Sequence, residues 1–286
     1  MLTLFLLFLA QSSYGLSNCL WKVKGRLLSS WWLLSVRSLV TFPLFLLILY
    51  LLDYYVTDSF RPWSDGQWLN AVWALPLSLV GLVMFIRSVR SGFVSKSVPL
   101  LGFISFWGIL SSVLLFNHSF QLSMMLPSIA MFVGFLLLST NDFKSFNFDK
   151  SLLLAMGAAF CWGITIPAFA DLSRDGGTWK LSAIQEGMVL LVATVAYWFK
   201  PVTDLRVNKG FGLPVLIGLL TVAGVGGTNY VLGNISPLVF SLLCLAQPAV
   251  SLLVAYAIMS ERMSRIQWLG TMLLITGSYW LMVDFQ

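Results

Sequence analysis

The feature that most constrains this chain is a series of continuous apolar runs, each about twenty residues long, separated by short polar segments. A helix of about 20 residues is long enough to cross the ~30 Å hydrocarbon core of a bilayer. Strands of a membrane β-barrel would instead alternate apolar and polar residues over segments of roughly ten residues. The sequence therefore predicts an all-α integral membrane protein.

The composition agrees with this class. Hydrophobic residues make up 58% of the 286 residues and charged residues 10%, against about 25% charged residues in an average soluble domain. This balance excludes a disordered tail and an ordinary cytosolic enzyme. The formal net charge is +6, but the basic residues lie in the short segments between apolar runs. That placement is typical of topology signals and lipid-surface contacts, and no nucleic-acid partner is predicted.

The apolar runs predict ten transmembrane helices. No connection between them is long enough for a soluble catalytic domain, since the longest polar ones cover only 53–67, 139–150 and 200–210. The predicted spans are residues 2–21, 30–52, 68–87, 93–116, 119–138, 151–172, 181–199, 211–232, 237–259 and 265–283.

The two halves of the chain resemble each other. A shift of 143 positions places Gly81 on Gly224 and Gly134 on Gly277. At a slightly different offset, Tyr14-Gly15-Leu16-Ser17 matches Trp162-Gly163-Ile164-Thr165. Because five spans is an odd number, the second half must enter the membrane from the opposite side. We therefore expect two inverted five-helix repeats, 1–140 and 151–286, an arrangement from which many secondary transporters are built.

One segment carries a family resemblance. Ser260-Glu261-Arg262-Met263-Ser264-Arg265-Ile266-Gln267-Trp268-Leu269-Gly270, followed by Thr276-Gly277, resembles the last-span signature of the EamA family in the drug/metabolite transporter superfamily. The Tyr14-Gly15 and Trp162-Gly163 pairs, and Arg37, are similar to further elements of that family. The first half departs from the pattern, because its corresponding turn reads Asn117-His118-Ser119-Phe120 without a Glu-Arg pair. The resemblance implies a multi-pass transporter of the bacterial inner membrane that exports amino acids or related metabolites.

The orientation in the membrane stays open at this point. The positive-inside rule places both termini outside the cytoplasm, whereas the family resemblance implies cytoplasmic termini. Only Arg61, Arg174 and Lys180 lie in the connections after the even-numbered spans. The connections after the odd-numbered spans hold Lys22, Lys24, Arg26, Arg87, Arg90, Lys96, Lys144, Lys150, Lys200, Arg206, Lys209, Arg262 and Arg265.

Two residues that are charged at neutral pH, Arg37 and Glu186, lie well inside predicted spans rather than near a span end. A charged group at membrane depth costs about 2.5–3.5 kcal/mol on insertion scales, so each calls for an explanation. Arg37 in the second span would bind a substrate carboxylate, or else reach the headgroups or form a structural pair. Glu186 in the seventh span would carry a coupled proton, or else lie at the interface or form a salt bridge to Arg37.

Polar and aromatic residues inside the spans complete the predicted substrate site. Gln11, Tyr14 and Asn18 share one face of the first span. Asn229 and Tyr230 follow a glycine-rich stretch, and Gln247 precedes a proline that interrupts the ninth span. Trp107 and Trp162 lie in the middle of their spans, where they would hold a flat or amphipathic solute. The alternatives are hydrogen bonds between helices, a simple kink and ordinary packing.

No enzyme constellation is present in the sequence. A single histidine, His118, makes metal clusters and His-based triads untenable, and no phosphate-binding loop or nucleophile elbow is found in the right context. We therefore predict no catalytic residue, no cofactor and no metal.

The resulting hypothesis is a secondary transporter that exports a small organic metabolite, with amino acids, including aromatic or amphipathic ones, as the first candidates. Its expected partners are the small-molecule substrate, membrane lipids and protons, and a monomer suffices. The alternatives are a transporter of nucleosides, vitamins, sugars or cationic amines, and, outside transport, a membrane scaffold or lipid-handling protein.

Overall fold

The structure, a computed structural model, describes residues 2–23, 29–56, 62–91, 99–119, 121–143, 150–174, 177–199, 211–259 and 264–284. The regular elements in this part of the chain are all helices. The predicted Glu261-Arg262 turn and many of the basic residues between spans lie outside the described residues.

The helices follow the predicted spans closely. The first half contains α1 (Leu2–Val23), α2 (Ser30–Val56), α3 (Asp65–Ser91), the 3-10 turn η2 (Pro99–Gly102), α5 (Phe103–Leu114), the 3-10 turn η3 (Leu122–Met124) and α6 (Met125–Phe143). The second half contains α7 (Lys150–Ser173), α8 (Gly177–Phe199), α9 (Gly212–Asn234), α10 (Pro237–Leu243), the 3-10 turn η5 (Cys244–Ala246), α11 (Gln247–Met259) and α12 (Arg265–Asp284).

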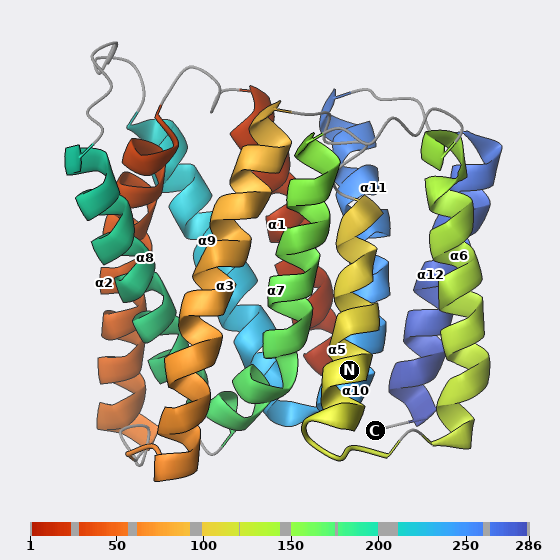
Figure 1. The fold of residues 1–286 in the computed structure, drawn as a ribbon, viewed down its shortest axis with the longest axis horizontal. Coiled ribbons are helices and arrows are strands. Elements are labelled where there is room, and N and C mark those ends of the chain that lie inside the picture. Colours follow the sequence, from red (N-terminus) through yellow and green to blue (C-terminus); the bar gives the residue numbers. More distant parts are fainter. Residues whose placement is uncertain are drawn as a thin grey trace.

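These helices lie side by side in one bundle, and successive spans run in opposite directions, with α10 and α11 forming one span (Figure 1). Among the described residues, six segments have both the length and the hydropathy needed to cross a bilayer: Ser30–Leu52, Asp65–Ser91, Lys150–Ser173, Gly177–Phe199, Gly212–Asn234 and Pro237–Val254. The multi-pass, all-helical membrane fold is thus supported, while the remaining four of the ten expected spans stay predictions.

The contacts between the halves follow a paired pattern. α1 packs on α9 as α3 packs on α7, and α1 packs on α11 as α5 packs on α7. Helices in equivalent places also contact each other, α2 with α8 and α6 with α12. In Figure 1, α1 rises where α7 descends. Exchanging the halves therefore maps the first two pairs of contacts onto each other and the α2–α8 and α6–α12 contacts onto themselves, which is the relation expected of inverted repeats.

A local feature occurs in both halves at the same register. Leu101 in η2 and Cys244 in η5 are 143 positions apart, the same shift that relates the glycines of the two halves. A 3-10 turn tightens the helix and misaligns its backbone hydrogen bonds. The Gln247-Pro248 pair follows η5 directly, so the predicted interruption of the ninth span is a short 3-10 turn rather than a wide break.

Two helices begin with the same capping arrangement. At the start of α3, the Gln67 amide oxygen accepts the Ser64 backbone N–H at 3.0 Å, and the Ser64 hydroxyl accepts the Gln67 backbone N–H at 3.3 Å. Ser264 and Gln267 repeat this at the start of α12, at 2.9 and 3.2 Å. Each box satisfies two otherwise free backbone donors. The glutamine of the last-span signature therefore has a structural role.

Candidate functional site

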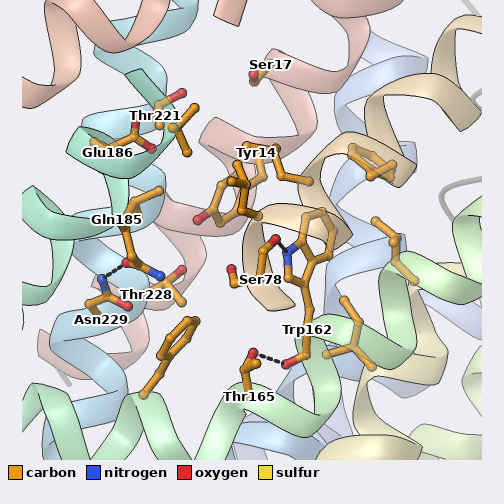
Figure 2. A pocket seen from close by; sticks show the side chains of 18 of the residues that line it. Tyr14, Ser17, Ser78, Trp162, Thr165, Gln185, Glu186, Thr221, Thr228 and Asn229 are labelled. Carbon is orange, nitrogen blue, oxygen red and sulfur yellow. Dashed lines mark hydrogen bonds between the residues drawn. The ribbon is translucent and has the colours of Figure 1, made fainter. Parts of the chain in front are cut away.

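A cavity of about 200 Å³ lies between the two halves and is lined by residues of α1, α2, α3, α5, α7, α8, α9, α10 and α11 and of the turns η2 and η5. It lies within the bundle rather than at its surface, since most of its lining residues come from the middle of long helices. Figure 2 shows polar side chains from α8 and α9 on one side, Trp162 on the other and Tyr14 between them. The cavity is thus amphipathic.

A buried salt bridge forms part of the polar side. Arg37 Nη2 donates to Glu186 Oε2 at 2.6 Å, and the two side chains are only 5% and 4% exposed. The hydroxyls of Ser38 and Thr41 donate to the same carboxylate oxygen, at 3.0 and 2.6 Å. Of the alternatives drawn from the sequence, the structure therefore shows the salt bridge, which joins α2 to α8 across the boundary between the halves.

A second polar group lies nearby on α8 and α9. Asn229 Nδ2 donates to Gln185 Oε1 at 2.7 Å and to Ser182 Oγ at 2.9 Å. Figure 2 shows Gln185 reaching Asn229 from the neighbouring helix. Both donor hydrogens of the Asn229 amide are therefore used, and its orientation is fixed.

Two aromatic side chains of the cavity, Trp162 and Tyr14, pack against glycines of the opposite half. A Cβ at Gly81 would lie 3.0 Å from Trp162 Nε1, and a Cβ at Gly224 would lie 2.9 Å from the Tyr14 ring. The indole is also oriented by a hydrogen bond from Trp162 Nε1 to the Ser78 carbonyl at 3.1 Å. The repeated glycines on α3 and α9 thus make room for the aromatic residues of the repeated tetrads on α7 and α1.

The structure brings most of the predicted site residues to this one cavity. Its lining includes Gln11, Tyr14, Asn18, Arg37, Trp162, Glu186, Asn229 and Gln247. Trp107 and Tyr230 are not part of the lining. Trp107 packs edge-on against Phe106 and Phe160, with ring centroids 5.1 and 4.9 Å away. Tyr230 follows Asn229, and adjacent helical residues point about 100° apart, so one of the two side chains turns away.

Several lining residues were not among the sequence predictions. On α9, Thr221, Val225, Thr228 and Leu232 lie at successive three- and four-residue steps along the face that carries Asn229. This helical spacing could have indicated that these residues share the face of the cavity. A lone threonine in an apolar helix gives a weak indication, however, because it usually donates to its own backbone, as Thr221 does to the Ile217 carbonyl at 2.8 Å. Other lining residues missed in this way are Ser17, Trp21, Ser78, Thr165 and Gln185.

A second, more polar recess of about 900 Å³ lies near the ends of α3, α5 and α7. Asn70 Nδ2 donates to Asp171 Oδ2 at 3.0 Å, and His118 and Arg174 line the same recess. Partial burial lowers the pKa of His118, and the positive charge of Arg174 lowers this pKa further. Phe169 lines the central cavity and Asp171 lines the polar recess. Less than one helical turn of α7 therefore separates the central cavity from the recess.

Comparison with known proteins found one similar solved structure and one family match. A solved structure, described only as a crystal structure of a protein, superposes with a TM-score of 0.75, at 14% sequence identity, over 99% of this chain and 96% of the other. At that identity the likeness shows the fold alone. No match among curated protein sequences was found.

The sequence pattern of the EamA-like transporter family matches residues 149–283. The matched range holds α7 to α12 almost entirely, including the Trp162-Gly163 pair and the start of α12. Residues 149–283 therefore match the EamA-like transporter family, a family of the drug/metabolite transporter superfamily, as the resemblance in the sequence implied.

Proposed function

We propose that this drug/metabolite-type membrane transporter is a secondary exporter of a small organic metabolite in a bacterial inner membrane, with amino acids, including aromatic or amphipathic ones, as substrates. The two halves, 1–140 and 151–286, act as inverted repeats that expose the cavity to either side in turn. The observation that carries the proposal is the amphipathic cavity lined by both halves.

The cavity chemistry suits a solute with a polar head and an apolar body. Its volume of about 200 Å³ is below the roughly 300–1,000 Å³ of pockets for drug-sized ligands, which favours a small metabolite. Arg37 would bind or organise a carboxylate, and Trp162 and Tyr14 would pack against the apolar part. Asn229 and Gln185 are held rigidly and would fix the orientation of the head group.

Replacing Trp162 with alanine is expected to lower substrate flux by at least about tenfold, because the aromatic wall of the cavity and the bond to the Ser78 carbonyl are both lost. The measurement is uptake of a panel of amino acids into proteoliposomes. Trp198→Ala is the matched control, since Trp198 is 81% exposed on the outer face of α8. Equal flux in wild type and Trp162→Ala, or flux of every solute at background, would contradict the proposed function.

Proton coupling through Glu186 is the second part of the proposal. Arg37, Ser38 and Thr41 all donate to Oε2, so this oxygen can take a proton only after these donors release it. Coupling through Oε2 would therefore require these contacts to rearrange during transport. We expect a pH gradient to accelerate flux in wild type and to leave Glu186→Gln unaffected. A gradient response that persists in Glu186→Gln assigns the coupling to another group.

A further inference from the structure

The charges that line the central cavity cancel. Among the described residues of its lining, Arg37 and Glu186 are the side chains that carry a formal charge at neutral pH, and they form the 2.6 Å salt bridge. Asp171, Arg174 and His118 line the polar recess instead, and Arg87 and Arg90 line a separate groove near the end of α3. The described lining of the cavity therefore has a net charge of zero.

This balance determines which solutes the cavity accommodates at low cost. A singly charged solute would leave its hydration shell and enter a site whose charges already neutralise each other, so its own charge would stay unpaired in a low-dielectric surrounding. A zwitterion brings one charge of each sign and can be accommodated beside the pair. An uncharged solute brings no charge to desolvate.

Unpartnered polar atoms in the lining indicate what a bound solute would offer. Gln11 Oε1, an acceptor, and Arg37 Nε, a donor, are buried and without a hydrogen-bond partner among the described residues. Both residues are 4% exposed and both line the cavity. Leaving such groups unsatisfied costs about 1–3 kcal/mol each. Both atoms are covered by protein in this structure, so each side chain would have to turn toward the cavity for Gln11 Oε1 to accept from an ammonium group and for Arg37 Nε to donate to a carboxylate.

We propose that the cavity selects solutes of zero net charge, with zwitterions that present both an ammonium and a carboxylate group preferred, and rejects their singly charged analogues. This inference rests on the proposed function in taking the central cavity as the substrate site. Arg37 and Glu186 determine specificity together: they hold the net charge of the site at zero and offer one partner of each sign.

The test compares three probes that share a phenyl ring and differ in charge: phenylalanine, 2-phenylethylamine as the cation and 3-phenylpropanoate as the anion. Binding to the purified full-length chain in detergent at pH 7 is measured by calorimetry, and 3-phenylpropanol serves as an uncharged fourth probe. We expect phenylalanine to bind best, and each charged probe to bind at least about tenfold more weakly than phenylalanine. Equal binding of a charged probe, or no binding of either zero-charge probe, overturns the inference.

Single substitutions at the pair should redirect this preference. Glu186→Gln leaves Arg37 unpaired, so the anion should become the best ligand. Arg37→Gln leaves Glu186 unpaired, so the cation should become the best. The double variant Arg37→Gln/Glu186→Gln restores a net charge of zero and is the matched control, because it should again disfavour both ions. Folded single variants that keep the wild-type charge preference overturn the inference, and the wild-type panel decides it even where a single variant fails to fold.

Transport measurements separate this inference from the proposed function. Proteoliposomes are tested for flux of the probes that bind. Charge-selective binding without flux refutes the transporter proposal and supports the charge selection. Flux of all the probes irrespective of charge supports a transporter and overturns the charge selection.

Discussion

Replacing Arg37 with methionine, with Glu186 kept, is expected to destabilise the protein by about 3–5 kcal/mol, because the substitution leaves a carboxylate buried without its partner. Glu186 is 3% exposed, and the hydroxyls of Ser38 and Thr41 alone would have to stabilise its charge. The measurement is the free energy of unfolding in mixed detergent and SDS, followed by the loss of helical circular dichroism.

The matched control for this prediction is the double variant Arg37→Met/Glu186→Leu. Replacing both members of a buried pair with apolar residues of similar volume is often neutral or stabilising, so the double variant should recover most of the loss. A single variant as stable as wild type would show that the Glu186 carboxylate is not held in a low-dielectric environment. A double variant as unstable as the single one would assign the loss to packing rather than charge.

The second large effect is expected at Gly163, where α7 meets α5. A Cβ at this position would lie 2.5 Å from the Trp107 Cβ and 2.7 Å from the Ile104 carbonyl oxygen. A backbone atom cannot move aside as a side-chain end can, so Gly163→Ala must push the two helices apart. We expect a loss of about 1–3 kcal/mol in the free energy of unfolding, although alanine is the better helix former.

Gly212→Ala is the control for this substitution, since a Cβ at Gly212 meets no atom within 4 Å. It should leave stability within about 0.5 kcal/mol of wild type. A Gly163→Ala protein as stable as Gly212→Ala would mean that α5 and α7 do not approach each other as closely as the structure shows. Because Ile104 lines the cavity next to this contact, substrate binding should weaken together with stability in Gly163→Ala.

Much of this fold could be predicted from the sequence because a bilayer imposes simple rules on the chain. The length of an apolar run determines whether it can cross, and each predicted span overlaps a described helix or a pair of helix segments. The ends were less predictable. α3 begins at Asp65, three residues before the predicted start, because the capping box of Ser64 and Gln67 fixes the start of the helix there. A hydropathy profile contains no information about capping residues.

The site could be predicted only in part, because the sequence of an apolar helix gives few indications of which helix face points toward the cavity. Gln11, Tyr14 and Asn18 share a polar stripe on an otherwise apolar helix, and the structure places all three at the cavity. Trp107 lacks such a stripe, so its position in the middle of a span did not reveal which way it faces. Whether any of these residues contacts a substrate stays a prediction for the flux and binding measurements.

The salt bridge between α2 and α8 also bears on the energetics of a transport cycle. A lone charge carried across a bilayer exchanges about 2.3 kcal/mol with the field per 100 mV of membrane potential. Arg37 and Glu186 are joined at 2.6 Å, so when the two helices move together they displace no net charge. A cycle that carries a solute of zero net charge past this pair, with no proton taken up at Glu186, would generate no current of its own, whereas a coupled proton would add one elementary charge per turnover and make the cycle respond to the membrane potential.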